Sequence, residues 1–162
     1  MKNTLSAAKA VLLCMFFVMC AVLSGQEPVV NRGRVDLSKW NFDTKSFVEL
    51  NGQWGFFWNE FVQSGESPAD FINVPDVWNA QSLKGKKYPA YGYATYTAKV
   101  LLPAGASGLG LYIEQPMTSV RVFVNNQEIG SIGKTEKSKN TYKPAAERRV
   151  FPFPTAIPNW IL

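Results

Sequence analysis

The chain has 162 residues, with 17 basic and 12 acidic side chains, a formal charge of +5 and no histidine. This length suits one domain. The absence of histidine removes the usual general base and a common zinc ligand, which disfavours most hydrolytic and zinc-dependent enzymes. The aromatic fraction of 14% favours β-strands, because large rings pack well on half-buried pleated surfaces.

Residues 1–24 are predicted to be a secretory signal peptide. Lys2 and Lys9 precede an uninterrupted apolar run of 14 residues, Ala10–Leu23, whereas a membrane-spanning helix needs about 20 residues. We expect cleavage after Ser24, with an uncleaved membrane anchor as the alternative. The protein is therefore expected to be exported, to the periplasm or to the outside of the cell.

Both cysteines, Cys14 and Cys20, lie in this leader, so the processed chain would have no thiol for a disulfide, a metal or catalysis. The residues ending at Cys20 loosely resemble a lipobox, but Met19 is larger than the residue that normally precedes a lipidated cysteine. Lipidation is therefore the less favoured alternative. Removing the leader and its two lysines leaves 15 basic and 12 acidic residues, a charge of +3. This excess is too small to indicate nucleic acid as a partner.

Residues 25–34 are polar and are predicted to be a flexible lead-in to a β-sandwich over residues 35–162. The first strong strand signal follows the turn dipeptide Asn51-Gly52. Trp54, Phe56 and Trp58 then share one face with period two, which favours packing in the core. After a polar loop, a short strand at Phe71–Val74 is expected to end at Pro75, because proline cannot continue a β-ladder.

Residues 76–92 are predicted to be a long connection, and Tyr93–Leu102 the longest strand. Further alternating stretches follow at 109–114, 120–124 and 127–132. Asn125-Asn126 suits a two-residue hairpin turn, since asparagine tolerates positive φ. Residues 133–149 are predicted to be a charged, mobile loop, and residues 149–153 a last strand before a proline-broken end.

No segment has a sustained period of 3.6 residues. Short alternating strands separated by turns rich in Gly, Pro and Asn instead predict an all-β fold, a jelly-roll β-sandwich. Two lysine clusters, at residues 84–87 and 134–143, are predicted to be solvated loops.

Several motifs occur in a recognisable order: Leu50-x-Gly52-x-Trp54-x-Phe56, Val74-Pro75-x-x-Trp78, Gly92-Tyr93-x-Thr95-Tyr96, Val100-x-Leu102-Pro103 and Val122-x-Val124-Asn125. This order resembles the galactose-binding-like jelly roll that opens family 2 glycoside hydrolases. It is more similar still to the N-terminal extracellular region of bacterial seven-transmembrane receptors with diverse intracellular signalling modules. The stretches 35–40 and 130–134 fit this second family better, and the resemblance covers roughly residues 33–153.

The resemblance implies a galactose-binding-like fold, a carbohydrate or other small ligand, and a role in signal transduction as part of a membrane receptor. Asn126 departs from the family pattern, where the hairpin usually has glycine. The family also continues with a further strand and a membrane domain, whereas this sequence stops at Leu162. We therefore expect a β-sandwich that either is complete or lacks its last strand or strands.

No catalytic residues, cofactor or metal site are predicted, and the chain is not expected to be an enzyme. The acidic residues show no spacing that would pair two carboxylates for glycoside hydrolysis. In the hydrolase family the catalytic acids belong to a separate barrel domain. A calcium site using Asp70 or Asp76 stays open as an alternative, although solvated surface acids are the simpler interpretation.

Ligand binding is predicted around the long connection, since loops at one end of a β scaffold commonly carry binding sites. The rings of Trp78, Tyr91 and Tyr93 are candidates to stack on a sugar, with Asn79 and Lys87 bonding to its hydroxyl groups. The equally weighted alternative is that these rings cover the open end of the sandwich. Arg121, on an otherwise apolar strand, is a candidate for binding an anionic ligand or, more simply, forms a salt bridge.

Three functions are consistent with these features. The first is a sensor or recognition module for a carbohydrate or other small ligand. The second is a docking module for another envelope protein, with an unpaired strand edge that recruits the partner. The third is a remnant of a family 2 glycoside hydrolase sugar-binding domain.

Overall fold

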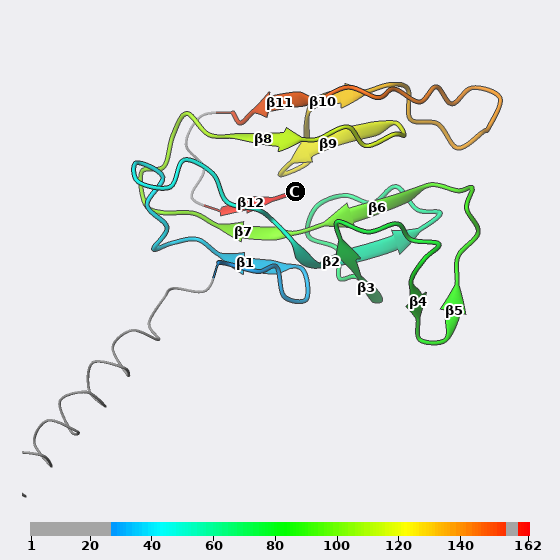
Figure 1. Cartoon of the computed structure of the whole chain (residues 1–162), viewed down its shortest axis with the longest axis horizontal. Helices are drawn as coiled ribbons and strands as arrows, with labels where there is room; N and C mark the ends of the chain where they lie inside the picture. Colours follow the sequence, from blue (N-terminus) through cyan, green and yellow to red (C-terminus); the bar gives the residue numbers. More distant parts are fainter. Residues whose placement is uncertain (1–26, 155–158) are drawn as a thin grey trace, which may run out of the picture.

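The computed structural model describes residues 27–154 and 159–162, which form strands in two facing layers joined by turns and loops (Figure 1). The predicted all-β fold is confirmed. The predicted signal peptide, both cysteines and residues 155–158 lie outside the described residues. Within the described part of the chain, no helix is long and apolar enough to span a membrane.

The lower layer in Figure 1 contains two three-stranded sheets, ordered β3-β2-β6 and β1-β7-β12. β1 runs parallel to β7, and the other neighbouring strands are antiparallel. The strands of this layer are β1 (Arg34–Asp36), β2 (Gly52–Trp58), β3 (Asp70–Val74), β6 (Ala94–Thr97), β7 (Lys99–Leu101) and β12 (Asn159–Ile161).

The strand predicted over Tyr93–Leu102 is divided into β6 and β7 at Ala98. Its neighbour changes at this residue, because β2 pairs as far as Thr97 and β1 begins to pair at Lys99. On the opposite edge, Ala98 exchanges two backbone hydrogen bonds with Leu162, of 3.0 and 2.9 Å. No strand was predicted at β12, because prolines interrupt the sequence just before these three residues and leave no alternating pattern.

The upper layer consists of two antiparallel pairs, β8 with β11 and β9 with β10. Its strands are β8 (Gly110–Ile113), β9 (Val120–Val124), β10 (Gln127–Ile132) and β11 (Arg149–Pro152). The predicted hairpin turn between β9 and β10 is confirmed, with φ of 48° at Asn125 and 70° at Asn126. A small hairpin of β4 (Ser82–Leu83) and β5 (Lys86–Lys87), within the predicted long connection, was not predicted from the sequence.

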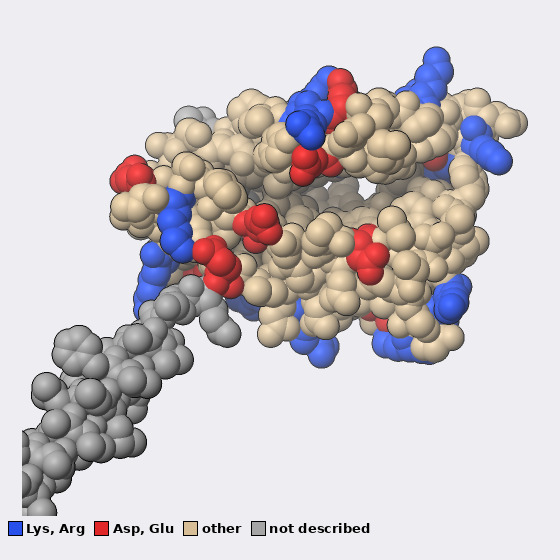
Figure 2. Space-filling model, in the orientation of Figure 1, with Lys and Arg blue, Asp and Glu red and all other residues tan. Residues whose placement is uncertain are grey.

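The core lies in three clusters of buried apolar side chains, and burial of this apolar surface is the main stabilising contribution. One cluster joins Val100 of the lower layer to Val124 of β9. A second, around Phe56 and Tyr88, is mostly aromatic, as the period-two pattern of β2 predicted. The third is built on Ile132 and Phe151 in the upper layer. Between the layers, Figure 2 shows a hollow in the surface.

The flexible lead-in predicted for residues 25–34 is wrong from Val30 onwards. Val30 is 1% exposed and belongs to the core. Its N–H donates to the carbonyl of Asn51 at 2.8 Å, and its own carbonyl accepts the N–H of Gln53 at 2.7 Å. Burial of the valine side chain and pairing with the start of β2 therefore order a segment whose polar composition suggested flexibility.

Candidate functional site

Five side chains from three separate segments make ring and cation–π contacts at one end of the molecule and are called here the aromatic–lysine cluster. Phe61, Tyr93 and Lys137 form one group of contacts, and Tyr91 and Lys139 form a second. Phe61 belongs to the loop after β2, the two tyrosines precede β6, and the lysines belong to the loop between β10 and β11. Figure 1 shows this last loop and the start of β6 at the same end of the two layers. The cluster thus connects the upper and lower layers.

The rings of Phe61 and Tyr93 lie 4.8 Å apart between centroids, tilted by 45°. The Lys137 ammonium lies 5.5 Å from the first centroid and 5.6 Å from the second. The Lys139 ammonium lies 5.6 Å from the Tyr91 ring. Phe61 and Tyr91 remain 44% and 46% exposed, so both rings present apolar surface to a ligand.

The two lysines of the cluster carry positive charge that no described carboxylate neutralises. The nearest acidic residue in the sequence, Glu136, forms its ion pair with Lys134 at 3.0 Å. Lys137 and Lys139 form no ion pair within the described residues. Cation–π contacts at exposed sites contribute only about 0.5–1 kcal/mol, so both ammonium groups can move to an acceptor oxygen of a ligand at small cost.

The scaffold holds the loop that carries Phe61 through hydrogen bonds to the start of β6. The Asn59 N–H donates to the carbonyl of Tyr93 at 2.8 Å. The Thr95 hydroxyl donates to the carbonyl of Glu60 at 2.7 Å and accepts the N–H of Val62 at 3.4 Å. These bonds bracket Phe61 and fix its position beside Tyr93.

The two tyrosines are positioned by the residue between them. Gly92 packs directly on the indole of Trp58, and a Cβ atom at this position would overlap that ring. Glycine therefore lets the backbone lie directly on the partly buried indole of Trp58. Contact with Trp58 therefore supports the backbone of the segment that carries the two tyrosines of the aromatic–lysine cluster.

Trp78, a predicted site residue, packs against the aromatic core and does not contribute a contact to the aromatic–lysine cluster. Its ring is half-buried and meets Trp58 edge to face, with centroids 5.4 Å apart and an angle of 70°. Its indole N–H donates to the carbonyl of Pro89 at 2.8 Å. Trp78 therefore covers part of the aromatic core cluster.

The remaining predicted residues are dispersed. Asn79 and Lys87 are exposed, the latter on β5. Arg121 lies on β9, where its Nη2 is 2.6 Å from Oε2 of Glu128 and its guanidinium covers the Phe123 ring at 4.9 Å. The hydrogen bond to Glu128 raises the pKa of Arg121. Arg121 thus forms the salt bridge that was the simpler sequence interpretation.

Of the predicted site residues, the structure brings only Tyr91 and Tyr93 together. Phe61, Lys137 and Lys139 were missed. Phe61 could have been identified as a site residue because it is a bulky aromatic residue inside a polar loop. The lysines lay in a loop interpreted as solvated, and no local pattern indicated that it folds back onto the lower layer.

The alternative calcium site is not assembled around Asp70, whose carboxylate pairs with Lys84 at 2.6 Å. Across residues 27–154 and 159–162, no group of three or more His, Cys, Asp or Glu side chains is placed to hold a metal ion.

Comparison with known proteins found no match: no protein family, no curated protein and no solved structure matches the chain.

Proposed function

We propose that the chain is a non-catalytic recognition module that binds a carbohydrate or similar ring-shaped small ligand through the aromatic–lysine cluster. One observation carries the proposal: exposed rings and unneutralised lysines from three distant segments converge on one end of the fold. Binding sites commonly form at the loop end of a β scaffold, with apolar surface and a few polar groups that orient the ligand.

The chemistry of the cluster matches a sugar in two respects. The exposed parts of Phe61 and Tyr91 offer flat apolar surface to the C–H face of a pyranose ring. The Lys137 and Lys139 ammonium groups have three N–H donors each, which suit hydroxyl or carboxylate oxygens on the rim of the sugar.

The wider role that we propose is that of an exported sensor domain with a jelly-roll fold. Support comes from the apolar leader and from the order of the motifs, which resembles the extracellular region of bacterial seven-transmembrane receptors. A binding domain of this kind signals by population shift, since ligand stabilises one arrangement of the receptor over another.

Titration calorimetry with a panel of mono- and oligosaccharides tests the proposal. We expect saturable binding, with Phe61→Ala and Tyr91→Ala each weakening it by about tenfold, which corresponds to about 1.4 kcal/mol of lost ring contact. The matched control is Tyr112→Ala, because Tyr112 is also exposed, at 54%, but lies on β8 outside the cluster. Failure of every sugar to bind, or equal binding by all three variants, would contradict the proposed function.

A second candidate function, docking of an envelope protein by strand addition, is favoured by the free edge of β6. β6 pairs with β2 on one side only within the described sheets. The Ala98 backbone bonds to Leu162 on the side facing away from β2. Because backbone groups alternate between the two sides of an antiparallel strand, those of Ala94 and Tyr96 point to this same side. Unpaired edges recruit extended segments of other chains. Sedimentation velocity discriminates, because an obligate docking module would self-associate or aggregate alone, whereas a stable monomer contradicts this candidate.

A further inference from the structure

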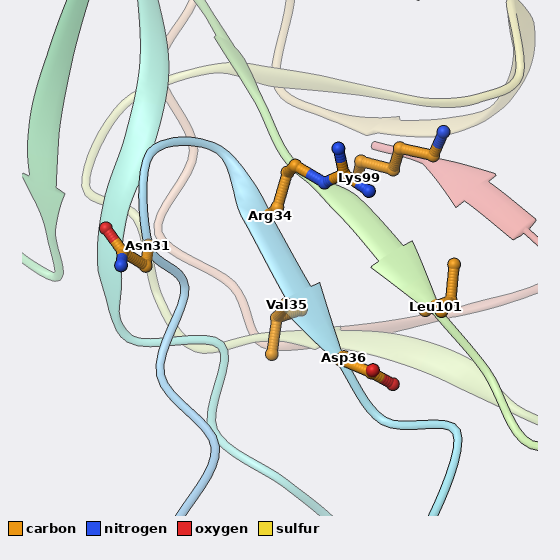
Figure 3. Close-up of a pocket in the computed structure, with 6 residues that line it drawn as sticks. All are labelled: Asn31, Arg34, Val35, Asp36, Lys99 and Leu101. Carbon is orange, nitrogen blue, oxygen red and sulfur yellow. The ribbon is translucent and has the colours of Figure 1, made fainter.

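Two cations lie side by side on neighbouring strands of the lower layer, β1 at the edge of its sheet and β7 at the centre. Arg34 on β1 and Lys99 on β7 are direct partners in the parallel register of these strands. Like charges on neighbouring strands repel each other and destabilise the pair. Figure 3 shows the Arg34 side chain reaching over β7 and the Lys99 side chain extending from β7 in the same direction.

No described carboxylate neutralises this pair, since neither Arg34 nor Lys99 takes part in an ion pair of the described residues. The acidic residue closest along β1 is Asp36, and Figure 3 shows its carboxylate directed away from both cations. Its Oδ1 accepts the N–H of Ser38 at 2.8 Å instead. The two positive charges are therefore available to a ligand.

The pair lines a cavity of about 270 Å³, which is also bordered by Asn31, Val35, Asp36 and Leu101. The volume accommodates a group several times larger than a water molecule, whose share of the liquid is about 30 Å³. Figure 3 shows the Asn31 side chain directed away from the two cations, so the charge at the cavity comes from Arg34 and Lys99. Concave shape and unneutralised charge thus coincide.

We propose that this cavity binds a phosphate group, either as inorganic phosphate or as a small phosphate ester, between the Arg34 guanidinium and the Lys99 ammonium. A guanidinium donates two parallel hydrogen bonds to such an oxyanion, and an ammonium adds a compact charge. Two cations also match the charge of about −1.5 to −2 that a phosphate monoester carries at pH 7. The site uses none of the residues of the aromatic–lysine cluster, so it stands independently of the proposed function.

The test is an NMR titration of the full processed chain with inorganic phosphate, at constant ionic strength maintained with sodium chloride. We expect saturable shifts confined to the amides of residues 31–36 and 99–101. The double variant R34Q/K99Q should bind at least tenfold more weakly. The control variant K86Q/K87Q removes two neighbouring exposed charges on β5 and should bind as the wild type does.

A parallel titration with glycerol 3-phosphate distinguishes the two sources of the phosphate group. Tighter binding of the ester than of inorganic phosphate assigns the site to esters, and equal binding assigns it to the free anion. Shifts spread over surface lysines without saturation, or unchanged binding by R34Q/K99Q, would overturn the proposal. Amide dispersion confirms that the double variant is folded, and the single variant K99Q repeats the test if it is not.

Discussion

Gly52→Ala is expected to lower the free energy of unfolding by about 2–4 kcal/mol, the range expected of a strained backbone combined with a steric overlap. Gly52 has a φ of 125°, a conformation that side chains with a Cβ rarely adopt. A Cβ here would overlap the carbonyl oxygen of Val30 and lie 2.8 Å from Cγ1 of Val29. Relief of the overlap requires the backbone around Val30 to shift away from the start of β2.

The measurement is urea denaturation, followed by tryptophan fluorescence, with the slope of the transition compared between variants. Gly85→Ala is the matched control, because Gly85 also has positive φ, 77°, but no atom lies within 4 Å of its added Cβ. The free energy of unfolding of this control should fall by about 1–2 kcal/mol from backbone strain alone. An equal fall in the free energy of unfolding of the two variants would show that the close approach of Val30 to β2 contributes nothing to stability.

Stability is expected to fall as the pH rises from 10 towards 12, by up to about 2–3 kcal/mol from a single side chain, Tyr96. Burial, assisted by the nearby charge of Asp76, raises the pKa of Tyr96 to about 12. In the unfolded chain the phenol ionises near its ordinary pKa of 10.0. The unfolded state therefore binds fewer protons in this window, and stability is present below pH 10 and lost as the pH approaches 12.

Tyr96→Phe isolates this contribution, because phenylalanine keeps the ring and cannot ionise. The variant should match the wild type near pH 8 and lose less stability by pH 11.5, as measured by urea denaturation at each pH. Burial also raises the pKa of Tyr88, so a smaller slope should remain in the variant. Identical pH profiles for the two proteins would contradict the burial of the Tyr96 phenol.

The strands were largely predictable, because alternation of apolar and polar residues is a property of neighbouring residues in the chain. β9, its turn at Asn125-Asn126 and the end of β3 at Pro75 follow from side-chain preference and backbone geometry alone. The strands that escaped prediction, β1, β4, β5 and β12, have two or three residues each. Segments this short show no period, and only pairing with a neighbour makes them strands.

The candidate site was only partly predictable, and the reason is distance along the chain. The tyrosines flanking Gly92 were identified from their composition and loop position. Phe61 and Lys137 are far apart in the sequence, and their meeting depends on how the β10–β11 loop folds onto the lower layer. The same holds for Arg34 and Lys99, which become neighbours only through the parallel pairing of β1 with β7.

The amino-acid sequence by itself determined the all-β class, the aromatic face of β2 and the loop that carries Tyr91 and Tyr93, because local patterns of hydrophobicity and turn residues specify these features. Tertiary structure decided which cations have partners. It gave Arg121 a carboxylate from the adjacent strand of its hairpin, and it paired Arg34, Lys99, Lys137 and Lys139 with none of the carboxylates in the described part of the chain. Charge neutralisation depends on distances of a few ångströms between side chains, and only the packing of the layers sets those distances.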